Sequence, residues 1–144
     1  MANQVFYEDV QEGAELPILE KLPTTRTLVM YAGASGDFFE LHYDKDFAMK
    51  MGFRNGPIVH GRLQAAMLSQ LITDWIGDQG ELKKFAIQYR GNALPGEKFL
   101  CKGKVTKKYV EGGQNLVECE VWGENPKGDK LTPGTVVVSL PSKG

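Results

Sequence analysis

The sequence predicts an α+β domain in which a curved antiparallel β-sheet wraps around one long central α-helix. One long apolar pattern of helical period begins near Gly61. The second half of the chain then changes to period two, with apolar and polar residues alternating over four segments. Short turns separate these segments, which favours antiparallel neighbours. No repeat or linker divides the chain, so we expect one domain over residues 1–144.

Two short helices are expected before the long one. Residues 24–25 offer N-caps for a helix over 26–32, because threonine hydroxyls accept hydrogen bonds from the first free amides. Gly33 and Gly36 are expected to end it, since glycine tolerates the left-handed conformation of a C-terminal stop. A second short helix is expected over 45–51. The stretch between the two helices is therefore predicted to be coil.

The long helix is expected to start at Gly61 and to run for about eighteen residues, or roughly 27 Å. Its large apolar residues recur every four positions and form one stripe: Leu63, Met67, Leu71 and Trp75. A stripe of this kind must be buried, and the concave face of the sheet is the surface that can cover it.

The sheet is expected to hold five strands. A short strand over 15–19 carries Pro17, which places it at an edge. The alternating segments cover 84–89, 98–105, 116–122 and 136–138. A curved antiparallel sheet around a single helix is the arrangement called the hot-dog fold. Its open edges favour a second subunit that extends the sheet, so we expect a dimer.

Composition and charge exclude several functional classes. A formal net charge of −1 without basic blocks argues against nucleic-acid binding, which needs clustered Lys and Arg. No stretch approaches the ~20 apolar residues of a membrane span, and residues 1–9 do not resemble a signal peptide. Cys101 and Cys119 are expected to be buried free thiols of a cytoplasmic protein, with a disulfide as the alternative if their strands are adjacent. No metal-ligand spacing is present, so no metal is expected.

Asp37 and His42 are the first candidates for chemistry. Five residues apart, they would lie about 140° apart on a helix and on opposite faces of a strand. They can converge only if the chain bends between them. If it does, a carboxylate and an imidazole can share one water molecule and act as an acid–base pair. The alternative is a solvated loop aspartate with an unrelated histidine, and Glu40 is a rival carboxylate.

His60 and Gly61 stand where the long helix begins. Amides at a helix N-terminus lack intrahelical acceptors and carry partial positive charge. Because Gly61 has no Cβ, a carbonyl oxygen can come close to such an amide, which would stabilise an enolate. His60 is a candidate second group at the substrate, or a buried histidine that holds the turn. Phe38, Phe39 and Val59 are candidates for an apolar pocket, or for the core.

Three stretches, 35–44, 47–48 and 57–61, together resemble the hydratase 2 motif of the MaoC-like family. They read Ser-Gly-Asp-Phe-Phe-Glu-Leu-His-Tyr-Asp, Phe-Ala and Pro-Ile-Val-His-Gly. This family contains (R)-specific enoyl-CoA hydratases and 3-hydroxyacyl-thioester dehydratases. The likeness extends from near Tyr31 through the long helix and, more loosely, over the strands.

The resemblance implies a hot-dog subunit that reversibly hydrates trans-2-enoyl thioesters to (3R)-hydroxyacyl thioesters. By position, Asp37 and His42 would activate and deliver the water, and the Gly61 amide would bind the thioester oxygen. The substrate would be an acyl-CoA or acyl-ACP whose pantetheine arm runs between subunits of a homodimer, a larger dimer-based oligomer or a heteromer. No metal or redox cofactor would be needed, since the CoA or phosphopantetheine thioester is itself the substrate.

Departures from the family pattern bear on the substrate more than on the chemistry. Phe39 and Glu40 stand where the family usually has Asn-Pro, and Arg62 replaces an apolar residue after the glycine. The family's asparagine helps to order the turn, which Phe39 cannot do. The aromatic pair at 38–39 favours a bulky or ring-bearing acyl group. A hot-dog acyl-CoA thioesterase and a non-catalytic partner subunit of a heteromeric dehydratase are the alternative functions.

Overall fold

The computed structural model of the chain describes residues 3–144, and residues 1 and 2 of the predicted domain lie outside the described residues. Its centre is a five-stranded sheet of order β1-β3-β4-β5-β2, in which every pairing is antiparallel. The strands are β1 (Leu19–Lys21), β2 (Glu81–Ile87), β3 (Phe99–Glu111), β4 (Gln114–Glu124) and β5 (Lys130–Ser139). The predicted antiparallel sheet is confirmed. Strands β3, β4 and β5 are longer than their predicted segments, whereas β2 begins earlier than predicted and ends two residues earlier, at Ile87.

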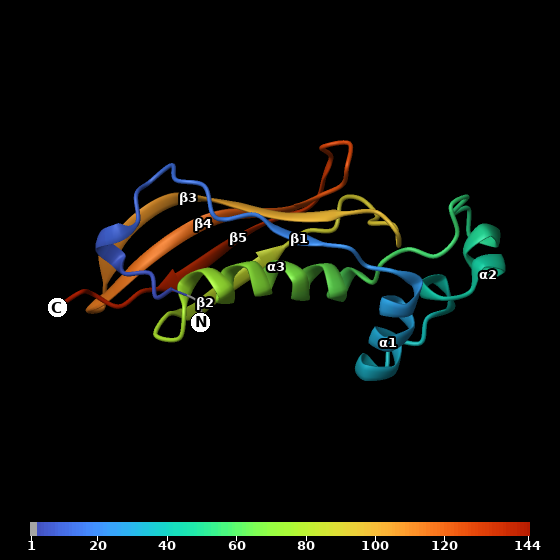
Figure 1. Ribbon diagram of the computed structural model, residues 1–144, viewed down its shortest axis with the longest axis horizontal. Coiled ribbons are helices and arrows are strands. Elements are labelled where there is room, and N and C mark those ends of the chain that lie inside the picture. Colours follow the sequence, from blue (N-terminus) through green and yellow to red (C-terminus); the bar gives the residue numbers. More distant parts are fainter. Residues whose placement is uncertain (1–2) are drawn as a thin grey trace.

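The long helix α3 (Gly61–Ile76) runs along one face of this sheet (Figure 1). It buries an apolar stripe against the strands: Met67, Leu68, Leu71, Ile72 and Ile76. Full burial of such a side chain contributes about 1.5–3 kcal/mol, so the stripe fixes the helix on the sheet. The helix stops at Gly77, whose φ of 73° is one that other residues rarely adopt. The predicted central helix is confirmed, with 16 residues.

A two-residue turn joins the two longest strands, β3 and β4. Gly112 and Gly113 both have positive φ angles, 57° and 73°, as a type I′ turn requires. The ladder therefore continues up to the pair Glu111 and Gln114 beside the turn. At one edge of the sheet, β2 pairs with β5 and with no other strand, so its outer edge is unpaired within residues 3–144.

The N-terminal strand lies later in the sequence than predicted. Ladder pairing with β3 covers residues 19–21, whereas the predicted range 15–19 adds one isolated bridge between Glu15 and Lys104. Pro17 explains the interruption, because proline lacks the amide hydrogen that a ladder needs. The predicted edge position is confirmed, since β1 is the terminal strand of the sheet.

Helices α1 (Thr25–Ser35) and α2 (Lys45–Lys50) lie beyond the start of α3 (Figure 1). Thr24 caps α1 with its hydroxyl, which accepts a hydrogen bond from a first-turn amide. Gly36 ends α1 in the left-handed conformation, with a φ of 76°. Gly33 lies inside the helix, so only the second of the two predicted stops acts as one.

The two cysteines lie in the core as free thiols, as predicted. Burial raises the pKa of both Cys101 and Cys119 to about 12. Both therefore stay protonated and unreactive near neutral pH. In the part of the chain that the structure describes, no helix has the length and apolar character needed to cross a membrane.

Candidate active site

The chain bends between Asp37 and His42, as their spacing requires if the two are to meet. Asp37 comes directly after Gly36, the left-handed residue that ends α1. A three-residue 3₁₀ helix, η2 (Glu40–His42), then turns the chain back. Leu41 anchors η2 in a small apolar cluster against α2. The bend thus rests on one glycine and one buried leucine.

Two hydrogen bonds hold the turn between Asp37 and His42. The Phe39 amide donates to the carboxylate oxygen Oδ1 of Asp37 at 3.4 Å. The hydroxyl of Tyr43 donates to the backbone oxygen of Phe38 at 2.8 Å. The turn is therefore ordered by the aspartate itself and by a tyrosine, in a sequence that lacks the asparagine of the family pattern.

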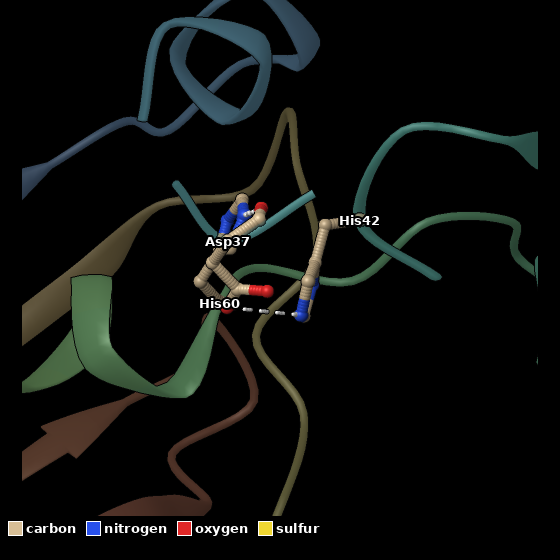
Figure 2. Close-up of side chains that lie close together, drawn as sticks. All are labelled: Asp37, His42 and His60. Atoms are coloured by element: carbon tan, nitrogen blue, oxygen red, sulfur yellow. Dashed lines mark hydrogen bonds and ion pairs between the residues drawn. The ribbon is translucent and has the colours of Figure 1, made fainter. Parts of the chain in front are cut away.

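The carboxylate of Asp37 and the ring of His42 face each other across a gap (Figure 2). Oδ2 of Asp37 lies 4.0 Å from Nε2 of His42. This is too long for a direct hydrogen bond, but one water oxygen can bond to both atoms at about 2.8 Å. His42 is buried, whereas the Asp37 side chain is 39% exposed. Solvent therefore reaches the gap from the Asp37 side.

The tautomer of His42 follows from its other nitrogen. Nδ1 lies 2.9 Å from the backbone oxygen of Ile58. A carbonyl oxygen can only accept, so Nδ1 carries the hydrogen of the neutral ring and Nε2 has a free lone pair. His42 can therefore take a proton from a water molecule that lies between it and Asp37.

His60 reaches the same place from the start of α3 (Figure 2). Its ring stacks on His42, with 3.9 Å between centroids and 22° between planes. Its Nε2 lies 3.4 Å from the backbone oxygen of Asp37. Tyr31 meets the same ring edge-on, at 4.8 Å. The His60 side chain is fully buried, and its predicted place beside the substrate stays a prediction.

Two amides are unpaired where α3 begins. Leu63 and Gln64 both donate their amide hydrogens to the His60 backbone oxygen. The amides of Gly61 and Arg62 precede these bonds and find no acceptor among residues 3–144. They form a small positive region next to His60, whose ring stacks on His42.

The ring of Tyr89 lies against Gly61. A Cβ atom on Gly61 would come within 3.0 Å of Cε1 and 3.2 Å of Cζ of that ring, so glycine is what allows this contact. Burial raises the pKa of Tyr89, and the positive charge of Arg62 opposes that rise. Tyr89 nevertheless remains 54% exposed. Its outer face can therefore meet a ligand at the start of α3.

The predicted pocket residues differ in exposure. Phe38 and Phe39 are 60% and 44% exposed, and Phe39 meets the His42 ring edge-on at 6.1 Å. Val59 lies in the main core instead. Glu40, the rival carboxylate, is exposed at the start of η2. The binding roles of these residues stay predictions, but Phe39 is the one that the structure brings to the pair.

Asp37, His42 and His60 offer three candidate ligand atoms within 4.8 Å of one another. A nitrogen lone pair lies in the plane of its own ring. Because the two rings are stacked and nearly parallel, their lone pairs do not converge on one ion. The arrangement therefore suits proton transfer better than metal chelation.

Sequence reasoning missed Tyr43, Tyr89 and the Ile58 backbone oxygen. Tyr43 lies inside the motif stretch 35–44, but its hydroxyl was given no role there. No local spacing links Tyr89 with Gly61, because the contact arises only when β2 runs back along α3 (Figure 1). The Ile58 oxygen carries no side-chain signal at all. Tertiary structure alone places the last two at the site.

The MaoC like domain model matches residues 8–121 of this chain. The chain belongs to the MaoC-like domain family. This confirms the resemblance that the motif indicates, and the family is one of hydratases and dehydratases.

Similar proteins cover nearly the whole MaoC-like chain. The 3-oxo-4,17-pregnadiene-20-carboxyl-CoA hydratase beta subunit of Mycobacterium tuberculosis (strain ATCC 25618 / H37Rv) is 28% identical over 128 residues, 89% of this chain and 95% of that protein. A chain of the ChsH1-ChsH2 complex from Mycobacterium tuberculosis superposes with a TM-score of 0.79 at 25% identity, covering 90% and 98% of the two chains. The (R)-hydratase from A. caviae involved in PHA biosynthesis gives 0.82 at 24% identity, covering 93% and 99%. These likenesses confirm the predicted hot-dog fold.

Proposed function

We propose that this chain catalyses the reversible hydration of trans-2-enoyl thioesters to (3R)-hydroxyacyl thioesters. The observation that carries the proposal is the gap of 4.0 Å between Asp37 Oδ2 and His42 Nε2. One water molecule fits this gap, and the adjacent start of α3 offers amide donors for a thioester oxygen. The reaction class of the MaoC-like family supports the same chemistry.

In this proposal the water is bound by both members of the pair. Asp37 accepts one of its hydrogens and Nε2 of His42 accepts the other. As the water oxygen bonds to C3 of the enoyl group, Nε2 takes a proton and the C2–C3 π electrons shift toward the thioester oxygen. The imidazolium then returns that proton to C2 of the enolate. The sum is one water added, with hydroxyl at C3 and hydrogen at C2, and dehydration is the reverse.

The enolate oxygen is assigned to the amide of Gly61. A preorganised amide that meets a developing oxyanion can contribute about 2.7–4 kcal/mol to the barrier reduction. Gly61 carries no Cβ that would block the approach of this oxygen. Because Tyr89 lies against the same residue, the acyl thioester would pass along the exposed face of that ring.

A ring-bearing acyl group is the proposed substrate class. Phe38 and Phe39 present exposed aromatic surface next to the pair, and Tyr89 adds a third aromatic side chain at Gly61. Aromatic surfaces of this kind favour flat, apolar ligands over short chains. The similar protein from Mycobacterium tuberculosis is a hydratase of a pregnadiene-carboxyl-CoA, which supports the same class. The carrier would be CoA or an acyl-carrier protein, and no metal or redox group enters the reaction.

The proposed active form contains a second subunit. The outer edge of β2 is unpaired within residues 3–144, and Phe38, Phe39 and Tyr43 expose apolar surface beside the site. A second copy of the chain, in a homodimer or a dimer-based oligomer, would cover both features. The similar proteins favour a different chain, because one is named a beta subunit and another belongs to a two-protein complex.

The test is an assay of the purified chain with trans-2-enoyl-CoA thioesters of short, medium and ring-bearing acyl groups. Loss of the conjugated-enone absorbance is followed for the chain alone and mixed with candidate second subunits. Turnover of a ring-bearing substrate is expected. Release of free thiol would instead indicate a thioesterase. If Asp37→Asn is as active as the natural chain in the mixture, the chain is a non-catalytic partner, and absence of turnover throughout would overturn the proposal.

A further inference from the structure

His60 is the group at this site that the proposed reaction leaves unused. It is 0% exposed, so it cannot reach a substrate in the single chain. Its Nδ1 atom is a buried side-chain nitrogen without a hydrogen-bond partner among residues 3–144. A buried nitrogen without a partner lowers stability by about 1–3 kcal/mol. Because a buried histidine lowers stability here and an apolar side chain would not, we look for a role of His60 other than packing.

The contacts of His60 define its chemical state. Nε2 lies 3.4 Å from the Asp37 backbone oxygen, which can only accept, so Nε2 carries the hydrogen. Nδ1 then holds a lone pair in a sealed position. Burial lowers the pKa of His60, and the charge of a protonated His42 would lower it further. At neutral pH the His60 ring is therefore neutral and in one tautomer.

The same contacts join both members of the acid–base pair. Nε2 holds the backbone of Asp37, and the face of the ring lies on His42 at 3.9 Å. Within residues 3–144, the ring of His42 makes one hydrogen bond, from Nδ1 to the Ile58 backbone oxygen. One bond at the ring edge leaves the ring able to tilt about it, and the stack removes that freedom. Figure 2 shows the His60 ring close to both groups.

We propose that His60 is a positioning residue that fixes the plane of the His42 ring and the backbone of Asp37, and so sets the gap in which water is activated. The effect of His60 on turnover rests on the proposed function. Its effect on the position of the His42 ring does not. A shift of 1 Å in a reacting group can lower the rate by about 100-fold. Tyr31, packed edge-on against His60, holds the stack from the other side.

Two variants separate positioning from packing. His60→Phe keeps a flat ring but removes both nitrogens, so the bond to Asp37 is lost and the unpaired Nδ1 disappears. His60→Gln keeps a neutral amide donor that can reach the Asp37 oxygen but removes the stack. We expect His60→Phe to unfold at the same or a higher temperature than the natural chain, with kcat lowered by about 10-fold or more and KM changed by less than about twofold. His60→Gln should recover part of kcat.

A readout that does not need activity is ¹⁵N NMR of the imidazoles, which is simple because the chain has 2 histidines. In the natural chain near neutral pH, the His60 signals should be those of a neutral Nε2–H ring, and a neutral His42 should show an Nδ1–H ring. In His60→Gln, which removes the stack, the His42 signals should shift toward a mixture of tautomers. Titration of His60 near its ordinary pKa in the natural chain, or unchanged His42 signals in His60→Gln, would overturn the proposal. If no substrate is hydrated, the proposed function fails while these spectra still decide the role of His60.

Discussion

The hydroxyl of Tyr43 donates a hydrogen bond of 2.8 Å to the backbone oxygen of Phe38. This bond spans the turn that carries Asp37 at one end and His42 at the other. With the amide of Phe39 bonded to Oδ1 of Asp37, it holds the two catalytic candidates on the same side of the bend. Tyr43 thus orders this turn by a side-chain hydrogen bond, which the side chains of Phe38 and Phe39 cannot make.

Loss of that hydroxyl is expected to loosen the turn. Tyr43→Phe should lower the free energy of unfolding by about 0.5–1.5 kcal/mol and kcat by about 10-fold, because the gap between Asp37 and His42 is no longer fixed. Thermal unfolding and steady-state kinetics measure the two effects. Tyr7→Phe is the matched control, since the Tyr7 ring lies under the Lys108 amine far from the site and the variant keeps that ring. A Tyr43→Phe enzyme with the natural kcat would contradict this role.

Gly61→Ala keeps the backbone amide but adds a Cβ where the thioester oxygen approaches it, and is expected to lower kcat by about 100-fold, as if the oxyanion donor were blocked. The new Cβ would lie 3.0 Å from the Tyr89 ring, so the ring is pushed toward the path of the thioester. Gly33→Ala is the control, because a Cβ at Gly33 has no neighbour within 4 Å. That variant should keep its kcat and gain about 0.5–1 kcal/mol of stability from its place inside α1. Equal kcat values for the two variants would contradict the claim that the thioester oxygen approaches the amide through the space left by the missing Cβ of Gly61.

The free energy of unfolding should decrease as the pH is lowered below the ordinary pKa of His60. Burial, first, and repulsion from a charged His42 lower the pKa of His60 below 6.5, whereas the unfolded chain titrates at that ordinary value. The unfolded chain therefore binds more protons at this residue, so the contribution of His60 to the free energy of unfolding is present above about pH 6.5 and is lost as the pH drops toward the lowered pKa. The titratable groups that face the ring are Asp37, His42 and Tyr31. Thermal unfolding at about pH 7.5 and 5.5 should show a larger loss for the natural chain than for His60→Phe, and equal losses would refute this assignment.

Asp37 and Glu40 lie in one turn but should respond differently to neutralisation. Asp37→Asn removes the charge that holds the water in place for His42 and is expected to lower kcat by about 100-fold, the cost of misplacing a reacting group. Glu40→Gln changes an exposed carboxylate at the start of η2 and should leave kcat within about twofold. Circular dichroism checks that both variants are folded. The reverse order of effects would make Glu40 the working carboxylate.

Periodicity predicts the parts of this fold whose packing is set by local pattern. The four-residue recurrence from Leu63 to Trp75 predicts α3, and alternation around Cys101 and Cys119 predicts two central strands. Strand β1 begins later than predicted because Pro17 interrupts the ladder. The alternation of apolar and polar residues does not show where a ladder is interrupted. The local sequence pattern thus predicts which helices and strands form better than it predicts the residues at which they begin and end.

Some residues of the candidate site can likewise be predicted from the local sequence, and others cannot. The motif predicts Asp37, His42 and Gly61, and the spacing argument predicts the bend that joins the first two. It does not predict the contact of Tyr89 with Gly61, because that contact depends on the return of β2 along α3. A buried His60 was one of the two interpretations that the sequence offered, and the structure buries it. The sequence does not predict its stacking on His42 or the covering of its Nδ1, because neither leaves a trace in neighbouring residues.

The most direct test of the central claim is to follow a ring-bearing trans-2-enoyl-CoA in ¹⁸O-labelled water by mass spectrometry, with the chain alone and in the presence of a second subunit. The account predicts an intact thioester that has gained one water, with the ¹⁸O at C3, and almost no product with Asp37→Asn. A product that carries ¹⁸O in a free carboxylate with release of the thiol, or labelling at C3 that is as fast with Asp37→Asn as with the natural chain, would contradict it.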